Sequence, residues 1–216
     1  MERAVLPGEV VACKANVHFL SCIPSCGLGN VFMFLDLHVS SILHYFEPPS
    51  VAMELYAEKV LMDGIRSLNL KSFVFGSADL GRPKWVQTFA DAFKTDLVLI
   101  RKSRSFQSVK VHEVIGDVVG KTIVIYDDMT RTGGSLINAA DAYLERGAVA
   151  VYAALSHLAL ASESVVQKLI DSKIIKIVCT NSHPSVEWAS VKQSDKFLVM
   201  NCTKTFADCV LKLVIQ

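Results

Sequence analysis

The stretch Ile123-Val-Ile-Tyr-Asp-Asp-Met-Thr-Arg-Thr-Gly-Gly-Ser135 decides the fold of this chain. Its apolar start predicts a buried strand, and Asp127 and Asp128 stand at the carboxyl end of that strand. Residues 136–146 have the apolar spacing of an amphipathic helix, with Ser135 as the expected N-cap. A strand, a glycine turn and a helix in this order are typical of open parallel sheets, which bind ligands at the carboxyl ends of their strands.

The loop between strand and helix, residues 130–135, has the composition of an anion site. Gly133 and Gly134 allow the backbone to come close to a ligand. The helix that follows offers free N–H groups and a dipole that favour phosphate, and Thr132 and Ser135 add hydroxyl donors. The acidic pair before the loop suits sugar hydroxyls or a hydrated divalent metal. The alternative is an ordinary strand–turn–helix connection.

Strand and helix patterns alternate through the rest of the chain. Strands are expected at 31–38, 73–76, 96–100, 108–114, 121–128, 150–157, 174–180 and 196–200, and helices at 10–22, 51–69, 83–93, 136–146, 162–171 and from 203 to the end. This rhythm predicts the α/β class, with a mostly parallel sheet covered by helices on both faces.

The composition excludes several classes of protein. The chain has 216 residues, 51% of them hydrophobic, and a formal net charge of +1. These values predict a packed globular protein whose main partner is neither nucleic acid nor a membrane. The start of the chain lacks the apolar core of a signal peptide. The six cysteines contain no CxxC pair, which favours reduced thiols and a cytoplasmic location.

The loop motif resembles the phosphoribosyl diphosphate (PRPP) motif of type I phosphoribosyltransferases and PRPP synthetases. Two further segments resemble the synthetases alone: Phe34-Leu-Asp-Leu-His-Val-Ser41, and Tyr45-Phe46 followed by Leu55-Tyr-Ala-Glu58. The resemblance covers about residues 31–216. It implies a phosphoribosyltransferase-like domain over 55–216 and a remnant of a first, similar domain over 1–54.

The resemblance also implies a role for each motif. The 5-phosphate of ribose 5-phosphate would lie against Thr130, Arg131, Thr132, Gly133, Gly134 and Ser135, and the ribose hydroxyls against Asp127 and Asp128. The diphosphate of ATP would lie against Asp79, Arg82, Lys84 and His38, and Mg²⁺ against His38, Asp79 and Asp36. Lys102 and Arg104, on a hairpin, would be catalytic and stabilise charge on the transferred diphosphoryl group.

Each of these outer motifs also has a plainer interpretation. Asp36 and His38, two residues apart at a strand end, face the same way and suit a metal, or are a surface carboxylate and a packed imidazole. The stretch 77–84 suits a diphosphate loop or a plain turn. The basic run 101–104 suits an active-site hairpin or a solvated turn.

The chain departs from the synthetases in two respects. It has no counterpart of about the first hundred residues of that family, which carry most of the adenine contacts, and residues 1–30 supply no nucleotide pocket. Arg131 stands where better-known members carry an acid. We therefore weigh three functions: a ribose-phosphate diphosphokinase that makes PRPP and AMP for nucleotide biosynthesis, an inactive regulatory or binding subunit, and a nucleobase phosphoribosyltransferase. The resemblance implies a homo-oligomer, or assembly with a full-length synthetase.

Overall fold

The computed structural model describes residues 6–25, 29–81, 83–105 and 108–215. The chain divides into two compact units, which we call unit one (Met1–Tyr56 with Thr203–Gln216) and unit two (Ala57–Cys202). Among the described residues, every helix is too short or too polar to span a membrane.

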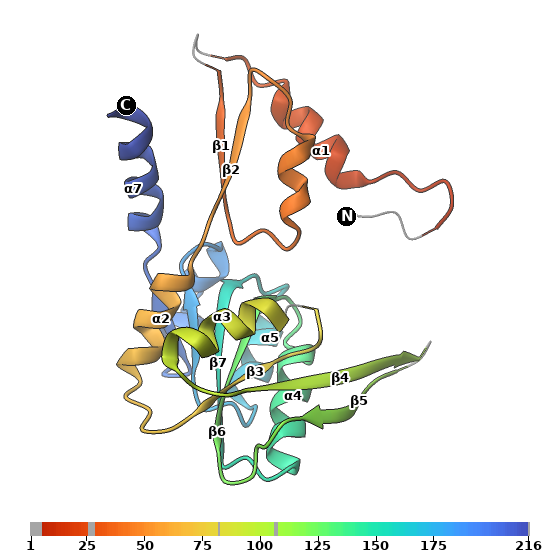
Figure 1. The fold of residues 1–216 in the computed structure, drawn as a ribbon, viewed down its shortest axis with the longest axis vertical. Coiled ribbons are helices and arrows are strands. Elements are labelled where there is room, and N and C mark those ends of the chain that lie inside the picture. Colours follow the sequence, from red (N-terminus) through yellow and green to blue (C-terminus); the bar gives the residue numbers. More distant parts are fainter. Residues whose placement is uncertain (1–5, 26–28, 82, 106–107, 216) are drawn as a thin grey trace. The chain divides into compact units, whose positions relative to one another are not determined.

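Unit two is built on a seven-stranded sheet of order β5-β4-β3-β6-β7-β8-β9. Its elements are α2 (Glu58–Ser67), β3 (Val74–Ser77), α3 (Pro83–Phe93), β4 (Leu97–Ser105), β5 (Ser108–Ile115), β6 (Thr122–Thr130), α4 (Gly134–Glu145), β7 (Ala150–Leu158), α5 (Glu163–Ile170), β8 (Ile177–Thr180), the 3-10 helix η2 (Pro184–Glu187), α6 (Ala189–Lys192) and β9 (Phe197–Met200). Neighbouring strands are parallel except β4 and β5, which pair antiparallel and extend away from the sheet as a long hairpin (Figure 1). The predicted α/β class and mostly parallel sheet are confirmed.

Both faces of this sheet are buried under helices. Along β6, Ile123 and Ile125 belong to the apolar cluster that includes residues of α4 and α5. Tyr126, which points to the opposite face, packs against Phe89 of α3 with ring centroids 4.4 Å apart. Successive strand residues alternate between faces, so a continuous apolar run such as 123–126 is what a sheet covered on both sides requires.

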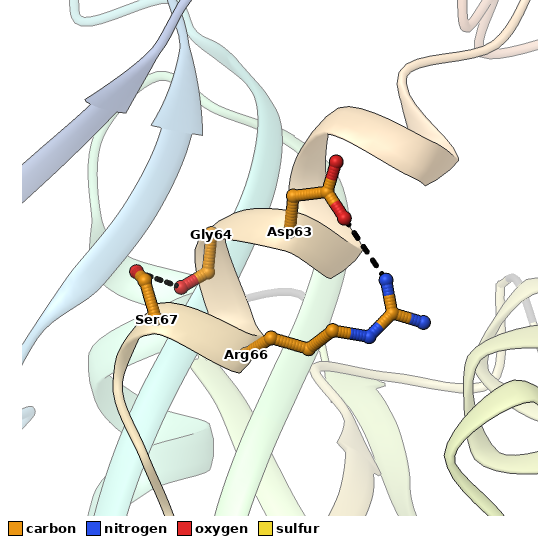
Figure 2. Close-up of polar contacts among 4 residues, drawn as sticks. All are labelled: Asp63, Gly64, Arg66 and Ser67. Carbon is orange, nitrogen blue, oxygen red and sulfur yellow. Dashed lines mark hydrogen bonds and ion pairs between the residues drawn. The ribbon is translucent and has the colours of Figure 1, made fainter.

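Helix α2 approaches the sheet closely through a glycine. A Cβ on Gly64 would lie 2.5 Å from Val178 Cγ1, so a larger residue does not fit there. The last turn of the helix carries its own polar contacts: Arg66 donates to Asp63 at 2.9 Å, and the Ser67 hydroxyl donates to the Gly64 carbonyl at 2.6 Å (Figure 2). Because Gly64 has no side chain, α2 can lie directly on β8.

Unit one is small. It contains α1 (Ala12–Ser21), β1 (Val31–Leu35), the 3-10 helix η1 (Ser40–Tyr45), β2 (Val51–Leu55) and α7 (Thr203–Val214). β1 and β2 form a two-stranded parallel sheet, and Phe46 packs against Phe32 with ring centroids 4.9 Å apart. Cys209 Sγ on α7 lies 3.2 Å from Met53 Sδ on β2, which ties the end of the chain to this unit.

Three expectations differ from the structure. The helix expected at 51–69 is a strand, β2, followed by the shorter helix α2, because residues 51–55 pair with β1. The strand expected at 31–38 ends at Leu35, because Asp36 has a positive φ of 44° that breaks the ladder. The second domain was expected to run from 55 to 216, whereas residues 203–216 group here with unit one.

Candidate functional site

The candidate site lies at one edge of the unit-two sheet, where three neighbouring parallel strands end. β3 ends at Ser77, β6 at Thr130 and β7 at Leu158, and β6 pairs with both others. Parallel strands end at the same edge, so the loops that follow β3 and β6 meet there. The site is therefore assembled from motifs about 50 residues apart in the sequence.

The acidic pair at the end of β6 is held in a confined position. Asp128 is buried, with 3% of the residue exposed, and the backbone N–H of Asp128 donates to Asp127 Oδ1 at 3.0 Å. The pKa of Asp127 is raised to about 7 by burial first, then by the charge and carboxyl contact of Asp128, and then by the charge of Asp79. The site thus concentrates negative charge that a hydroxyl-rich or cationic ligand would relieve.

The loop after β6 has the geometry of an anion site. Gly133 has a positive φ of 73° and is buried, and a Cβ on it would lie 3.2 Å from Leu169 Cδ2. Helix α4 begins at Gly134, and its first internal bond runs from Ile137 N–H to the Gly133 carbonyl at 2.9 Å. The amides of the residues between have no acceptor within the helix, so they are available to bind an anion.

The expected N-cap is wrong. Gly133, in the left-handed conformation, is the N-cap, and Ser135 lies inside the first turn of α4 with its side chain exposed. The left-handed glycine lets the chain enter the helix two residues before the serine. Arg131 and Thr132 are also exposed, and the Arg131 carbonyl accepts from Ala161 N–H at 3.0 Å. The loop is thus anchored by its backbone, and the side chains of Arg131, Thr132 and Ser135 remain accessible, whereas Thr130, the last residue of β6, is buried.

The loop after β3 brings a third carboxylate toward this edge. Asp79 Oδ1 accepts from Gly81 N–H at 2.6 Å, which closes a tight turn before α3. Its charge contributes to the raised pKa of Asp127, so the two carboxylates face a common region. Lys84 is exposed in the first turn of α3. Arg82 lies outside the described residues.

The expected catalytic residues lie on the hairpin. Lys102 and Arg104 belong to β4, where a register irregularity between Arg101 and Lys102 interrupts the pairing with β5. Their side chains lie outside the described part of the structure. Their catalytic role stays a prediction.

The first metal-ligand pair lies in unit one and differs from the expectation. Asp36 is buried and lies in a bend, and its N–H donates to the Leu55 carbonyl at 2.9 Å. His38 is exposed. Neither residue lies in a strand, because β1 ends at Leu35. Burial and the charges of Glu54 and Asp36 raise the pKa of the Tyr56 phenol, so both carboxylates lie near this phenol. A joint role for His38 and Asp79, which belong to different units, stays a prediction.

The carboxylates of the site suit a metal ion that is shared with substrate. Within the described ranges, no three His, Cys, Asp or Glu residues gather as a self-contained metal site would require. Mg²⁺ usually takes only one or two carboxylates and completes its shell with water and substrate phosphates. Asp79 beside the anion loop fits that second arrangement and not a preformed cage.

The raised pKa of Asp127 predicts a pH-dependent stability. A carboxyl whose pKa is higher in the folded chain than in the unfolded one destabilises the fold once it ionises, so the free energy of unfolding falls as pH rises from about 4 to about 7. Replacing Asp127 with Asn should remove this fall. Between pH 5 and pH 8 we expect the stability advantage of Asp127→Asn over the wild type to grow by about 2 kcal/mol in urea unfolding.

The exposed Asp117 supplies the matched control for this prediction. Its hydrogen bond to Lys121 lowers its pKa, so its contribution changes only in more acidic solution. The stability difference between Asp117→Asn and the wild type should stay constant from pH 5 to pH 8. A constant difference for Asp127→Asn as well would contradict the raised pKa.

Comparisons with known proteins agree with this geometry. Residues 97–214 match the model of the phosphoribosyl synthetase-associated domain. Ribose-phosphate pyrophosphokinase A of Dictyostelium discoideum is 32% identical over 213 residues, which cover 96% of this chain and 62% of that protein. Ribose-phosphate pyrophosphokinase 2 of Saccharomyces cerevisiae is 36% identical over 156 residues, covering 69% of this chain and 47% of that protein.

A solved structure resembles nearly the whole chain. The phosphoribosylpyrophosphate synthetase of Mycobacterium smegmatis superposes with a TM-score of 0.83 and 26% sequence identity, covering 99% of this chain and 67% of that one. The chain thus spans 62% and 47% of the two curated relatives described above.

Proposed function

The chain belongs to the phosphoribosyl synthetase family, and on that premise we propose that it is a ribose-phosphate diphosphokinase. Its reaction would convert ATP and ribose 5-phosphate into PRPP and AMP. The observation that carries the proposal is the β6–loop–α4 segment, where the half-buried Asp127 and the buried Asp128 stand before a left-handed glycine and a helix N-terminus. This arrangement presents acceptors for a sugar and donors for its phosphate within one turn of chain.

The proposed binding roles follow from the chemistry of each group. The first-turn amides of α4, with the hydroxyls of Thr130, Thr132 and Ser135, bind the 5-phosphate, and Arg131 adds a positive charge at the exposed side. Asp127 and Asp128 accept hydrogen bonds from the ribose hydroxyls. Hydrogen bonds from hydroxyls to carboxylates are stronger than those between neutral groups.

The proposed reaction is a displacement at phosphorus. The O1 hydroxyl of the sugar attacks the β-phosphorus of ATP and loses its proton to water. The bond between the β-phosphorus and the oxygen that bridges it to the α-phosphorus breaks, and AMP leaves with that oxygen. Asp79, Lys84, Lys102 and Arg104 position the diphosphoryl group and balance its charge. Catalysis of this kind depends on positioning and electrostatic stabilisation and needs no covalent intermediate.

Magnesium is part of the proposal. When bound, Mg²⁺ neutralises charge on the ATP phosphates, as in other phosphoryl transfers. Asp79 is the described residue best placed to hold it together with substrate, and Asp36 and His38 are the unit-one candidates.

A second candidate function is a regulatory or binding subunit that assembles with a full-length synthetase. One observation favours it: unit one contains only two paired strands among its described residues. We propose that residues 1–54 are a remnant of the first synthetase domain, that the protein self-associates or joins a longer synthetase, and that it acts in the cytoplasm. A nucleobase phosphoribosyltransferase is set aside because the relatives matched along the chain are pyrophosphokinases.

The test of the proposal is AMP formation by the purified chain with ATP, ribose 5-phosphate and Mg²⁺. We expect AMP that depends on the sugar and is absent without it. If the folded chain binds ribose 5-phosphate but forms no AMP, and co-purifies with a longer synthetase, the subunit function replaces the enzymatic one. If it binds no ribose 5-phosphate, both are wrong.

A further inference from the structure

One buried hydroxyl connects α4, the helix that follows residues 130–135 (here called the phosphate loop), to β3 and β4. These two strands lead to the other site motifs. Tyr143, near the end of α4, has 0% exposure. Its hydroxyl lies 2.9 Å from the Ser77 carbonyl oxygen on β3 and 3.2 Å from the Val98 carbonyl oxygen on β4. A hydroxyl has one proton to donate, so it is shared between carbonyls of two different strands.

The connection occurs where the sheet has little pairing of its own. β3 and β4 are in register at only two positions, Phe75 with Leu97 and Gly76 with Val98. Beyond them, β4 continues to Ser105, and the next link is a side-chain bond from Ile100 N–H to Ser77 Oγ at 3.1 Å. At this end of the β3–β4 pair, side-chain hydrogen bonds therefore join the strands, as backbone hydrogen bonds do elsewhere in the sheet.

The ring of Tyr143 reaches these carbonyls because Gly76 lacks a side chain. A Cβ on Gly76 would lie 3.0 Å from two atoms of the Tyr143 ring and 2.7 Å from Ile123 Cγ2. The glycine therefore keeps open the space that the ring occupies, and any larger residue there must displace the ring or the isoleucine.

We propose that Tyr143 is a positioning residue that fixes the loop carrying Asp79 and the strand carrying Lys102 and Arg104 relative to the helix of the phosphate loop. Ser77 lies two residues before Asp79, and Val98 lies four residues before Lys102. The inference rests on the proposed function for its consequence, the alignment of diphosphate and sugar. A displacement of about 1 Å between reacting groups can reduce turnover by about 100-fold.

The first test needs no ligand. In Tyr143→Phe, which removes only the hydroxyl, we expect amide hydrogen exchange to become about tenfold faster in peptides covering 75–80 and 97–101, because a buried hydrogen bond is lost there. Gly76→Ala should do the same by displacing the ring. Val166→Ala on α5, a buried residue of the same apolar cluster, is the matched control for general destabilisation. Unchanged exchange at both segments in Tyr143→Phe, or an equal increase in Val166→Ala, would overturn the inference.

The second test separates positioning from stability. In steady-state AMP formation, Tyr143→Phe should lower kcat by about 10- to 100-fold while the KM for ribose 5-phosphate changes less than threefold, because the phosphate loop itself is untouched. Val166→Ala should leave kcat of the folded fraction unchanged. An unaltered kcat in Tyr143→Phe contradicts the positioning role. Absence of turnover in the wild type contradicts the proposed function instead, and hydrogen exchange then decides the positioning role alone.

Discussion

Asp128→Ala is expected to weaken ribose 5-phosphate binding by at least about 100-fold, because the carboxylate would accept two hydrogen bonds from sugar hydroxyls, each contributing about 1.5–3 kcal/mol. Isothermal titration of the sugar phosphate into the purified variant measures the loss. Asp128→Asn, which keeps the shape of the side chain and one acceptor oxygen, should lose less.

Stability distinguishes this loss of binding from unfolding. Asp128 is buried and has contacts of its own, so Asp128→Ala is expected to melt below the wild type, and binding is measured at a temperature where the apo variant is shown to be folded. Asp141→Ala, on the α4 helix but in an ion pair with Lys173, is the matched control and should bind the sugar normally. Normal binding by a folded Asp128→Ala variant would remove the acidic pair from the site.

The second large effect is expected for Gly133→Ala. A residue with a side chain tolerates the positive φ of 73° poorly, and its Cβ would also lie 3.2 Å from Leu169 in the core. We expect a loss of about 2 kcal/mol in the free energy of unfolding, from backbone strain and crowding together. Because this residue sets where α4 begins, we also expect affinity for ribose 5-phosphate to fall by about tenfold or more as the first-turn amides shift.

Gly120 provides a control with similar backbone conformation and no crowding. Its φ is 69°, and a Cβ there would meet nothing within 4 Å. Gly120→Ala should therefore cost only the backbone strain, about 1 kcal/mol, and leave sugar binding unchanged. Urea unfolding and titration calorimetry on both variants give the comparison. Equal stability losses would mean that Leu169 yields without cost, and equal affinities would separate the loop from phosphate binding.

Much of the fold could be predicted from the sequence, because buried strands and amphipathic helices leave clear periodic patterns. The run before Asp127 predicted β6, and Pro83 predicted the start of α3. The failure at 51–55 has a physical reason: these five residues contain apolar side chains spaced acceptably for either structure. Residues 51–55 form a strand because they pair with β1, about 20 residues earlier in the sequence, and a local pattern carries no information about that pairing.

The candidate site was predictable only in part. The residues at the end of β6 and in the loop after it follow one another in the sequence, so their proximity needs no tertiary information. The resemblance named Asp79, but its proximity to the acidic pair depends on the pairing of β3 with β6. Asp36 required knowledge of its backbone, because a positive φ of 44° turns a presumed strand residue inward. In both cases the deciding quantity is a tertiary contact or a dihedral angle.

The hydrogen bonds of Tyr143 could not be predicted from the sequence, for a different reason. On the apolar face of an amphipathic helix, a tyrosine looks like any other core residue, and nothing nearby in the sequence marks its hydroxyl as bonded. Its partners, Ser77 and Val98, precede it by 66 and 45 residues. The one local sign is that a buried phenol needs an acceptor, which predicts that a bond exists and not where it goes.

The grouping of residues 203–216 with the beginning of the chain bears on the order of events during synthesis. Unit two is one continuous stretch, so all of its strands are available once residue 202 has left the ribosome. Unit one gains α7 only after all of unit two has been synthesised, because Thr203–Gln216 follow unit two in the sequence. Domains generally fold as units while the chain is being made. The nascent chain therefore has all of unit two available for folding before unit one is complete.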